Sequence, residues 1–233
     1  MGGCMAPPET PPGEKAGTLV ERVVLFDAAR TIQDQWWHLP LRSTTEYRLS
    51  HIGGRLAIRA IGRNSASVLI RRVSFDPTSC PDIEWSWRVD AVQPDADIRV
   101  KDQEDVSASI FLLFGDPGFL SNPTPVPTLR YVWTNARVPK GAVIDNPYLP
   151  GIVRSIVVQS GEENLGTWVV EKRNILADYR RAFGAMPEND VEAVALFTDN
   201  DQTGQPVEAY YGSAQVACYS ENFVEEVSDE FDE

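Results

Sequence analysis

The residues best suited to chemistry lie in one polar loop, Thr198-Asp199-Asn200-Asp201-Gln202-Thr203-Gly204. Asp199, Asp201 and Thr203 place oxygen atoms at alternate positions, and the final glycine permits a sharp turn. This spacing is typical of the first half of a calcium loop, but position twelve is Tyr210 instead of the expected acid. Asx turns in a plain hairpin explain the same residues. We therefore expect a turn and no cofactor, and we keep calcium bound by Asp199, Asp201 and Thr203 as the alternative.

A second group of charged residues could line a cleft: Glu104, Asp105, Asp178, Glu171 and Arg173. Two carboxylates about 5–9 Å apart would suit glycoside hydrolysis. Acidic residues at strand ends are more commonly just solvated. The chain has only two histidines and no G-x-S-x-G nucleophile motif. We assign no catalytic residue and favour a protein that is not an enzyme.

Tryptophans offer a different chemistry, because their rings can stack on the apolar faces of sugars. In Ile83 to Val89, the W-x-W pair shares one face with two aliphatic residues, so we expect it to pack in the core. The remaining tryptophans could be exposed. Together with two acids they form the candidate ligand-binding set, which is Trp36, Trp37, Trp133, Trp168, Glu104 and Asp105.

The elements that must position these residues are mostly strands. Val191 to Phe197 carries apolar residues on both faces, which is typical of an inner strand of a layered β structure. Further strands are expected at 45–49, 55–61, 67–75, 83–89, 106–114, 128–133, 152–159 and 167–170, with proline- and glycine-rich turns between them. The pattern predicts an all-β fold, a jelly-roll-like β-sandwich with one short helix.

That helix is expected after Asn174, which can cap its first turn. Ile175, Leu176, Tyr179 and Phe183 form one apolar stripe, and Gly184 follows at the C-terminal end. We expect the helix to lie over one end of the sandwich.

Length and charge define the domain organisation and exclude some partners. The 233 residues divide into a Pro-rich leader (1–17), one β-sandwich domain (18–220) and an acidic tail (221–233). The net charge is −13, and the tail holds seven acids and no base, so −13 + 7 leaves −6 elsewhere. We therefore expect no nucleic-acid partner.

The three cysteines lack the spacing of a zinc site. Met1-Gly2-Gly3-Cys4 followed by a Pro-rich stretch is similar to the end of a bacterial lipoprotein signal peptide, which predicts a lipid on Cys4. A spare thiol in a flexible leader is the alternative. Cys80 and Cys218 lie at strand margins, and we predict that they approach each other and form a disulfide.

Several ordered blocks resemble a family of exported bacterial proteins that share a domain of unknown function. The similarity spans about residues 45 to 216, and the blocks are Trp85 to Val89, Glu104-Asp105, Tyr131 to Trp133, Asp178-Tyr179 with Phe183-Gly184, and Thr198 to Gly204. The family pattern has an arginine where Ser109 stands, which puts any contact of that arginine in doubt here. The resemblance implies an extracytoplasmic jelly roll similar to carbohydrate-binding domains, and it implies no known activity.

Together these features predict an exported, lipid-anchored binding module of the cell envelope or periplasm. We expect it to be non-catalytic, with a glycan or an envelope protein complex as the partner, and to meet the membrane only through the anchor. A polysaccharide-active enzyme that uses paired carboxylates is one alternative. An accessory structural subunit of an envelope complex is the other.

Overall fold

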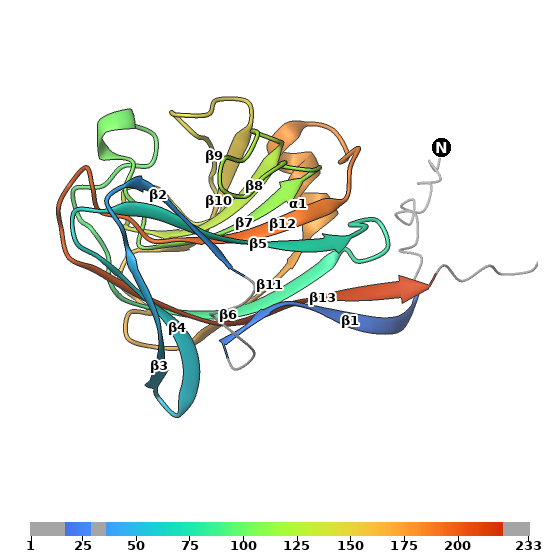
Figure 1. Ribbon diagram of the computed structural model, residues 1–233, viewed down its shortest axis with the longest axis horizontal. Coiled ribbons are helices and arrows are strands. Elements are labelled where there is room, and N and C mark those ends of the chain that lie inside the picture. Colours follow the sequence, from blue (N-terminus) through green and yellow to red (C-terminus); the bar gives the residue numbers. More distant parts are fainter. Residues whose placement is uncertain (1–16, 29–35, 221–233) are drawn as a thin grey trace, which may run out of the picture.

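The computed structural model describes residues 17–28 and 36–220, which form two β-sheets packed face to face (Figure 1). Cys4 and the acidic tail lie outside the described residues, so lipidation stays a prediction. The six-stranded sheet contains β11 (Val169–Asn174), β6 (Asp82–Ala91), β13 (Val207–Ser220), β4 (Arg55–Gly62) and β3 (Glu46–Ile52) in that order, and β1 (Thr18–Asp27) also pairs with β13.

The seven-stranded sheet contains β2 (Trp37–Arg42), β5 (Ala66–Phe75), β12 (Val191–Phe197), β7 (Ala108–Phe114), β8 (Thr128–Thr134), β10 (Val153–Ser160) and β9 (Val143–Asp145) in that order. All its pairings are antiparallel except β8 with β10. A 3-10 turn, Lys101–Gln103, precedes β7. The predicted all-β, jelly-roll-like sandwich with one short helix is confirmed for the described residues.

Strand β12 is an inner strand, as its two apolar faces predict, because it pairs with β5 on one side and β7 on the other. The plain hairpin expected after it is wrong. Strand β13 belongs to the other sheet and pairs with β6 and β4. The polar loop 198–206 therefore runs from the seven-stranded sheet, which contains β12, to the six-stranded sheet, which contains β13.

The core between the sheets is rich in aromatic rings. The predicted core position of Trp85 and Trp87 is confirmed, with exposed fractions of 1% and 0%. Trp85 stacks on Tyr131 at a centroid distance of 4.8 Å, and Trp87 contacts Trp133 at 5.8 Å. Trp133 is fully buried. The expectation that it is an exposed sugar platform is wrong, because it alternates with Val132 on β8 and points inward with Tyr131.

Helix α1 (Ile175–Phe183) begins and ends where the sequence predicts. The Asn174 side chain accepts a hydrogen bond from the Ala177 N–H at 2.9 Å. Gly184 adopts the left-handed conformation (φ 77°), and its N–H donates to the Arg180 carbonyl. Ile175 and Tyr179 are buried in the main core, so the helix closes part of the sandwich.

Cys80 and Cys218 form the predicted disulfide. The bond joins the segment before β6 to the end of β13, across a sequence separation of 138 residues. Disulfides persist in oxidising compartments, so the bond is consistent with an extracytoplasmic location. Among the described residues, no helix is long and apolar enough to cross a membrane.

Candidate functional site

The outer face of the seven-stranded sheet carries a row of side chains in register. Trp37 on β2 lies opposite Ile70, which lies opposite Ala195, and Ala195 lies opposite Phe111. Phe111 in turn lies opposite Arg130 on β8. Cross-strand partners point to the same face of a sheet. The row therefore forms a continuous strip from an exposed edge strand to a buried cation.

Most of this strip forms the floor of an open groove of about 160 Å³. The floor is apolar, and two long loops form the walls. Pro123, Pro125 and Val126 come from the loop between β7 and β8, and Leu149 and Ile152 come from the loop between β9 and β10. An apolar groove with few polar groups is typical of a binding site for the apolar part of a ligand.

The first wall is held in place by Arg72 on β5. Its guanidinium donates to the Asp116 carboxylate at 2.7 Å and also to the Gly118 carbonyl. The Thr124 N–H donates to the Pro117 carbonyl at 2.7 Å, which folds the loop back on itself. This wall is therefore built before any ligand arrives.

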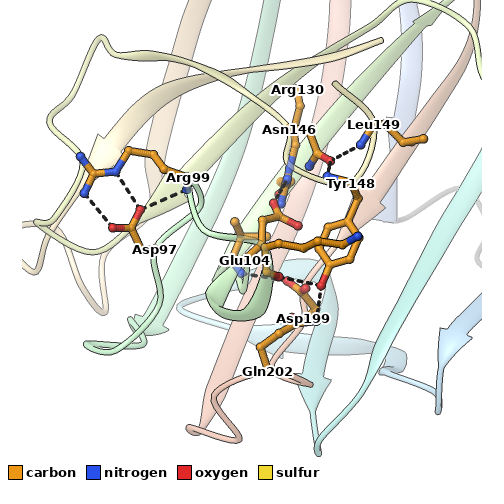
Figure 2. A network of polar contacts seen from close by, with 12 residues as sticks. Asp97, Arg99, Glu104, Arg130, Asn146, Tyr148, Leu149, Asp199 and Gln202 are labelled. Carbon is orange, nitrogen blue, oxygen red and sulfur yellow. Dashed lines mark hydrogen bonds and ion pairs between the residues drawn. The ribbon is translucent and has the colours of Figure 1, made fainter. Parts of the chain in front are cut away.

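The second wall is held by Asn146 and Tyr148 (Figure 2). The Asn146 side chain accepts from the N–H groups of Tyr148 and Leu149 at 2.9 and 3.0 Å. The Tyr148 hydroxyl donates to the Lys101 carbonyl at 2.6 Å and accepts from Gln202 at 3.1 Å. Both walls are thus pre-organised, which lowers the entropy lost on binding.

Among the tryptophans predicted to bind a ligand, Trp37 alone lies in register with the groove floor. Its exposed fraction is 50%, so about half of its surface is accessible to a ligand. Trp36 is part-buried and contacts Phe26 at a centroid distance of 5.9 Å. Trp168 is part-buried at the other sheet, where it donates to the Ile52 carbonyl at 3.3 Å. The four predicted tryptophans therefore do not form one platform.

At the buried end of this strip, next to the groove floor, lies an ion pair (Figure 2). Arg130 is 1% exposed, and its guanidinium donates to the Glu104 carboxylate and to the Ser109 hydroxyl, the latter at 3.1 Å. It also lies over the rings of Phe111 and Phe197, with distances of 5.2 and 5.7 Å to their centroids. Arg130 therefore supports Phe111, part of the groove floor, from the side away from Trp37.

Next to this ion pair, three carboxylates gather at the loop that joins the sheets. Ligand oxygens of Asp105, Asp199 and Asp201 all lie within 4.8 Å of one another. Asp105 and Asp199 are buried. Arg42 reaches Asp201 at 3.6 Å from an exposed position. Oxygen donors at this separation are the ligand type that calcium prefers.

Burial is the main cause of the raised pKa values of the acids in and next to this group. Burial raises the pKa of Asp199 well above its usual value, and the nearby Glu104 carboxylate raises it further. Burial also raises the pKa of Glu104, although Arg130 opposes that shift. The pKa of Asp201 is raised by burial and then by Asp105. Burial therefore disfavours the charged form of each of these three acids.

The structure changes the predicted set of metal ligands. Thr203 is not the third member of the group, because its hydroxyl and its N–H both donate to Asp105, at 2.6 and 2.7 Å. Asp105, which the sequence analysis placed in the ligand-binding set, takes that position. The neighbouring Gln202 has a side-chain oxygen that is buried and without a hydrogen-bond partner among the described residues.

The acids that could have formed a hydrolytic cleft fall into two groups. Asp178 accepts from Tyr131 at 3.0 Å and from Arg173, on the core side of β8. Glu104 binds Arg130, the residue next to Tyr131, on the opposite face of the same sheet. Glu171 accepts from Gln159 at 2.6 Å. Glu104 and Asp178 therefore lie on opposite faces of the sheet and do not form a catalytic pair.

Arg130 was missed by sequence reasoning, which singled out Glu104 without its partner. The two residues are 26 positions apart, and an arginine on a strand is ordinarily exposed. The family resemblance gave a hint, since it implies an arginine at the position of Ser109. In this chain Ser109 accepts a hydrogen bond from an arginine on the adjacent strand.

Comparison with known families assigns the chain to one of them. The model of DUF3047, a protein family of unknown function, matches residues 34–215, and the chain belongs to this family. The predicted resemblance to a domain of unknown function is thus confirmed. Among curated proteins, none matches the sequence.

Solved structures with a similar fold are remote in sequence. The family 11 carbohydrate-binding module of a Clostridium thermocellum cellulase aligns with a TM-score of 0.45 at 6% identity, over 86% of this chain and 96% of that one. The family 30 carbohydrate-binding module of another C. thermocellum cellulase aligns with a TM-score of 0.43 at 7% identity, over 84% of this chain and 97% of that one. An adhesin domain of Porphyromonas gingivalis Lys-gingipain aligns with a TM-score of 0.40 at 12% identity, over 84% of this chain and 99% of that one. At these scores, function must be argued from this chain's own residues.

Proposed function

We propose that this member of the DUF3047 family is an exported, non-catalytic binding module, and that its ligand is a carbohydrate held across the groove of the seven-stranded sheet. The observation that carries the proposal is the position of Trp37. A half-exposed tryptophan at the edge of a sheet stands in register with an apolar groove floor. The disulfide between Cys80 and Cys218 supports export.

Carbohydrate fits the groove because sugar rings are amphipathic. Their C–H faces stack on aromatic rings such as Trp37, and their hydroxyls remain in contact with water at the open side. The groove is shallow and open, so one ring of a longer glycan would lie in it while the rest extends along the sheet. Leu39, which is next but one to Trp37 on β2, also lines the groove and continues the apolar surface.

A calcium ion at Asp105, Asp199 and Asp201 is part of the same proposal. The three carboxylates are close together, the pKa of Asp199 is strongly raised, and the Gln202 side-chain oxygen is buried nearby with no hydrogen-bond partner among residues 17–28 and 36–220. A divalent cation would offset the repulsion among these acids. The Gln202 amide also contacts Tyr148, so an ion here would further fix the second wall of the groove.

The test is a glycan array followed by calorimetric titration of the best oligosaccharide. Trp37→Ala should weaken binding by at least about tenfold, which corresponds to about 1.4 kcal/mol. Trp168→Ala is the matched control, because it removes the same ring from the other sheet, and it should leave the affinity unchanged. Incubation of the oligosaccharide with the wild type should yield no cleaved product.

Three results would contradict the proposal. Equal loss of affinity in both tryptophan variants would place the ligand elsewhere. Release of shorter saccharides would make the protein an enzyme. Binding of a fatty acid without binding of any saccharide would mean that the apolar groove accepts an acyl chain instead.

A further inference from the structure

A second hollow lies on the outer face of the six-stranded sheet, on the opposite side of the sandwich from the groove. Its volume is about 370 Å³, within the range of small-ligand sites. Four side chains stand in register across its floor. Arg22 on β1 lies opposite Ala217 on β13, which lies opposite Asp82 on β6, and Asp82 lies opposite Asn174 at the end of β11.

The hollow exists because Ala217 is small. Its methyl group lies between the larger side chains of Arg22 and Asp82, and Tyr219 stands two residues further along the same strand. The disulfide fixes this floor, since Cys218 lies between Ala217 and Tyr219 and is bonded to Cys80, two residues before Asp82. A fixed hollow surrounded by polar groups is a feature of a binding site more than of a random surface.

The hollow is lined by both acidic and basic side chains. The Asp82 carboxylate accepts from Asn174 at 3.0 Å and from the Tyr219 hydroxyl at 2.7 Å. Glu84 pairs with Lys172 at 3.0 Å on the next register row. In the part of the chain that the structure describes, the exposed guanidinium of Arg22 has no ion-pair partner.

This mixture selects a class of ligand. A simple anion would pair with Arg22 but would be repelled by Asp82, whereas the charge of Glu84 is offset by Lys172. A neutral sugar would donate its hydroxyls to those carboxylates but would leave the guanidinium unpaired. A sugar that carries a carboxylate satisfies both, because its hydroxyls donate to the acids while its carboxylate takes a bidentate pair with Arg22.

We propose that the hollow over Ala217 is a second binding site, and that it takes an acidic saccharide through Arg22. The inference deepens the proposed function, because it rests on the module being a carbohydrate binder, but it uses none of the groove residues. The two sites face away from each other on the two sheets. Acidic glycans would therefore reach the protein on a different side from the ligand that stacks on Trp37.

The experiment titrates the full chain with trigalacturonate and with its methyl ester, which has the same rings without charge. We expect saturable binding of the acid and at least tenfold weaker binding of the ester. Arg22→Ala should weaken the binding of trigalacturonate at least tenfold. Arg63→Ala removes another exposed arginine, outside the hollow, and should leave the binding of trigalacturonate unchanged. Ala217→Leu, which fills the floor without changing charge, should abolish binding while the melting temperature stays within a few degrees.

Several results would overturn the second site. The second site is rejected if trigalacturonate does not bind, or if it binds to the Arg22→Ala variant as tightly as to the wild type. Inorganic phosphate that competes at the same concentration as trigalacturonate would show a simple anion site instead. Trp37→Ala separates the two proposals, because trigalacturonate binding should survive in that variant. If the hollow does not bind trigalacturonate, the proposal for the groove still stands. If the groove does not bind a saccharide, the Arg22→Ala titration still tests the hollow.

Discussion

Replacing Arg130 by methionine tests how the groove floor is supported. The substitution keeps an unbranched apolar stem but removes the guanidinium that pairs with Glu104 and lies over Phe111. Both partners of this ion pair are buried, with side-chain exposures of 1% and 7%. Breaking a buried pair leaves an uncompensated charge and costs about 3–5 kcal/mol. A domain of this size has only about 5–15 kcal/mol of stability, so the loss should be obvious in urea unfolding.

The cost should also depend on pH. Burial raises the folded-state pKa of Glu104 and Asp199 above the unfolded values of about 4, and Arg130 lowers both. A raised carboxyl pKa gives stability that is fully present below the unfolded pKa and is lost as pH rises through the folded pKa. Removing Arg130 raises both folded pKa values further. The destabilisation by Arg130→Met should therefore shrink as the pH falls from 7 toward 4.

Two further variants make the result decisive. Arg154→Met breaks the more exposed pair with Asp145, in which the side chains are 30% and 41% exposed, so it should cost less than about 1 kcal/mol. Adding Glu104→Gln to Arg130→Met should recover part of the lost stability, because the Glu104 carboxylate that lost its partner is then replaced by a neutral amide. The reasoning is refuted if Arg130→Met costs no more than Arg154→Met, or if its cost is the same at pH 7 and pH 5.

Other predictions follow from the same structure. Calcium at a hundred times its dissociation constant should stabilise the wild type by about 2.7 kcal/mol, and Asp201→Ala should abolish the shift; a wild-type melting temperature that calcium leaves unchanged would mean a turn and no ion. Replacing Cys80 and Cys218 by serine should cost about 2–4 kcal/mol in denaturant unfolding, and no loss would contradict the bond. Mass spectrometry of protein from its own host should show a diacylglyceryl adduct on Cys4, and an unmodified Met1 in the cytosolic fraction would contradict the lipid anchor.

Much of the fold could be predicted because local patterns carry it. A strand with two apolar faces, such as β12, has to be covered on both sides. The helix after Asn174 was predictable because its cap, its apolar stripe and its terminal glycine all lie within one short segment. Strand β2 was missed because it lies at the sheet edge, contains Pro40 and has no buried residue, so its sequence shows no alternation.

The candidate site was less predictable because its parts come from distant segments. Trp37 was singled out as an aromatic residue in polar company, but its alignment with Ile70 follows only from strand register. The sequence showed the two wall segments as long loops and could not show that they face each other. Thr203 was taken for a ligand because a local spacing rule cannot include Asp105, which comes from a segment about a hundred residues earlier.

The most direct test of the central claim is the NMR signal of the Trp37 indole N–H, followed while an oligosaccharide from the glycan array is added. The groove account predicts that the Trp37 signal shifts in a saturable way with the same dissociation constant as the calorimetric titration. The indole signal of Trp168, on the other sheet, should stay in place. A shift at Trp168 with none at Trp37 would contradict the account, because the saccharide would then bind away from the groove.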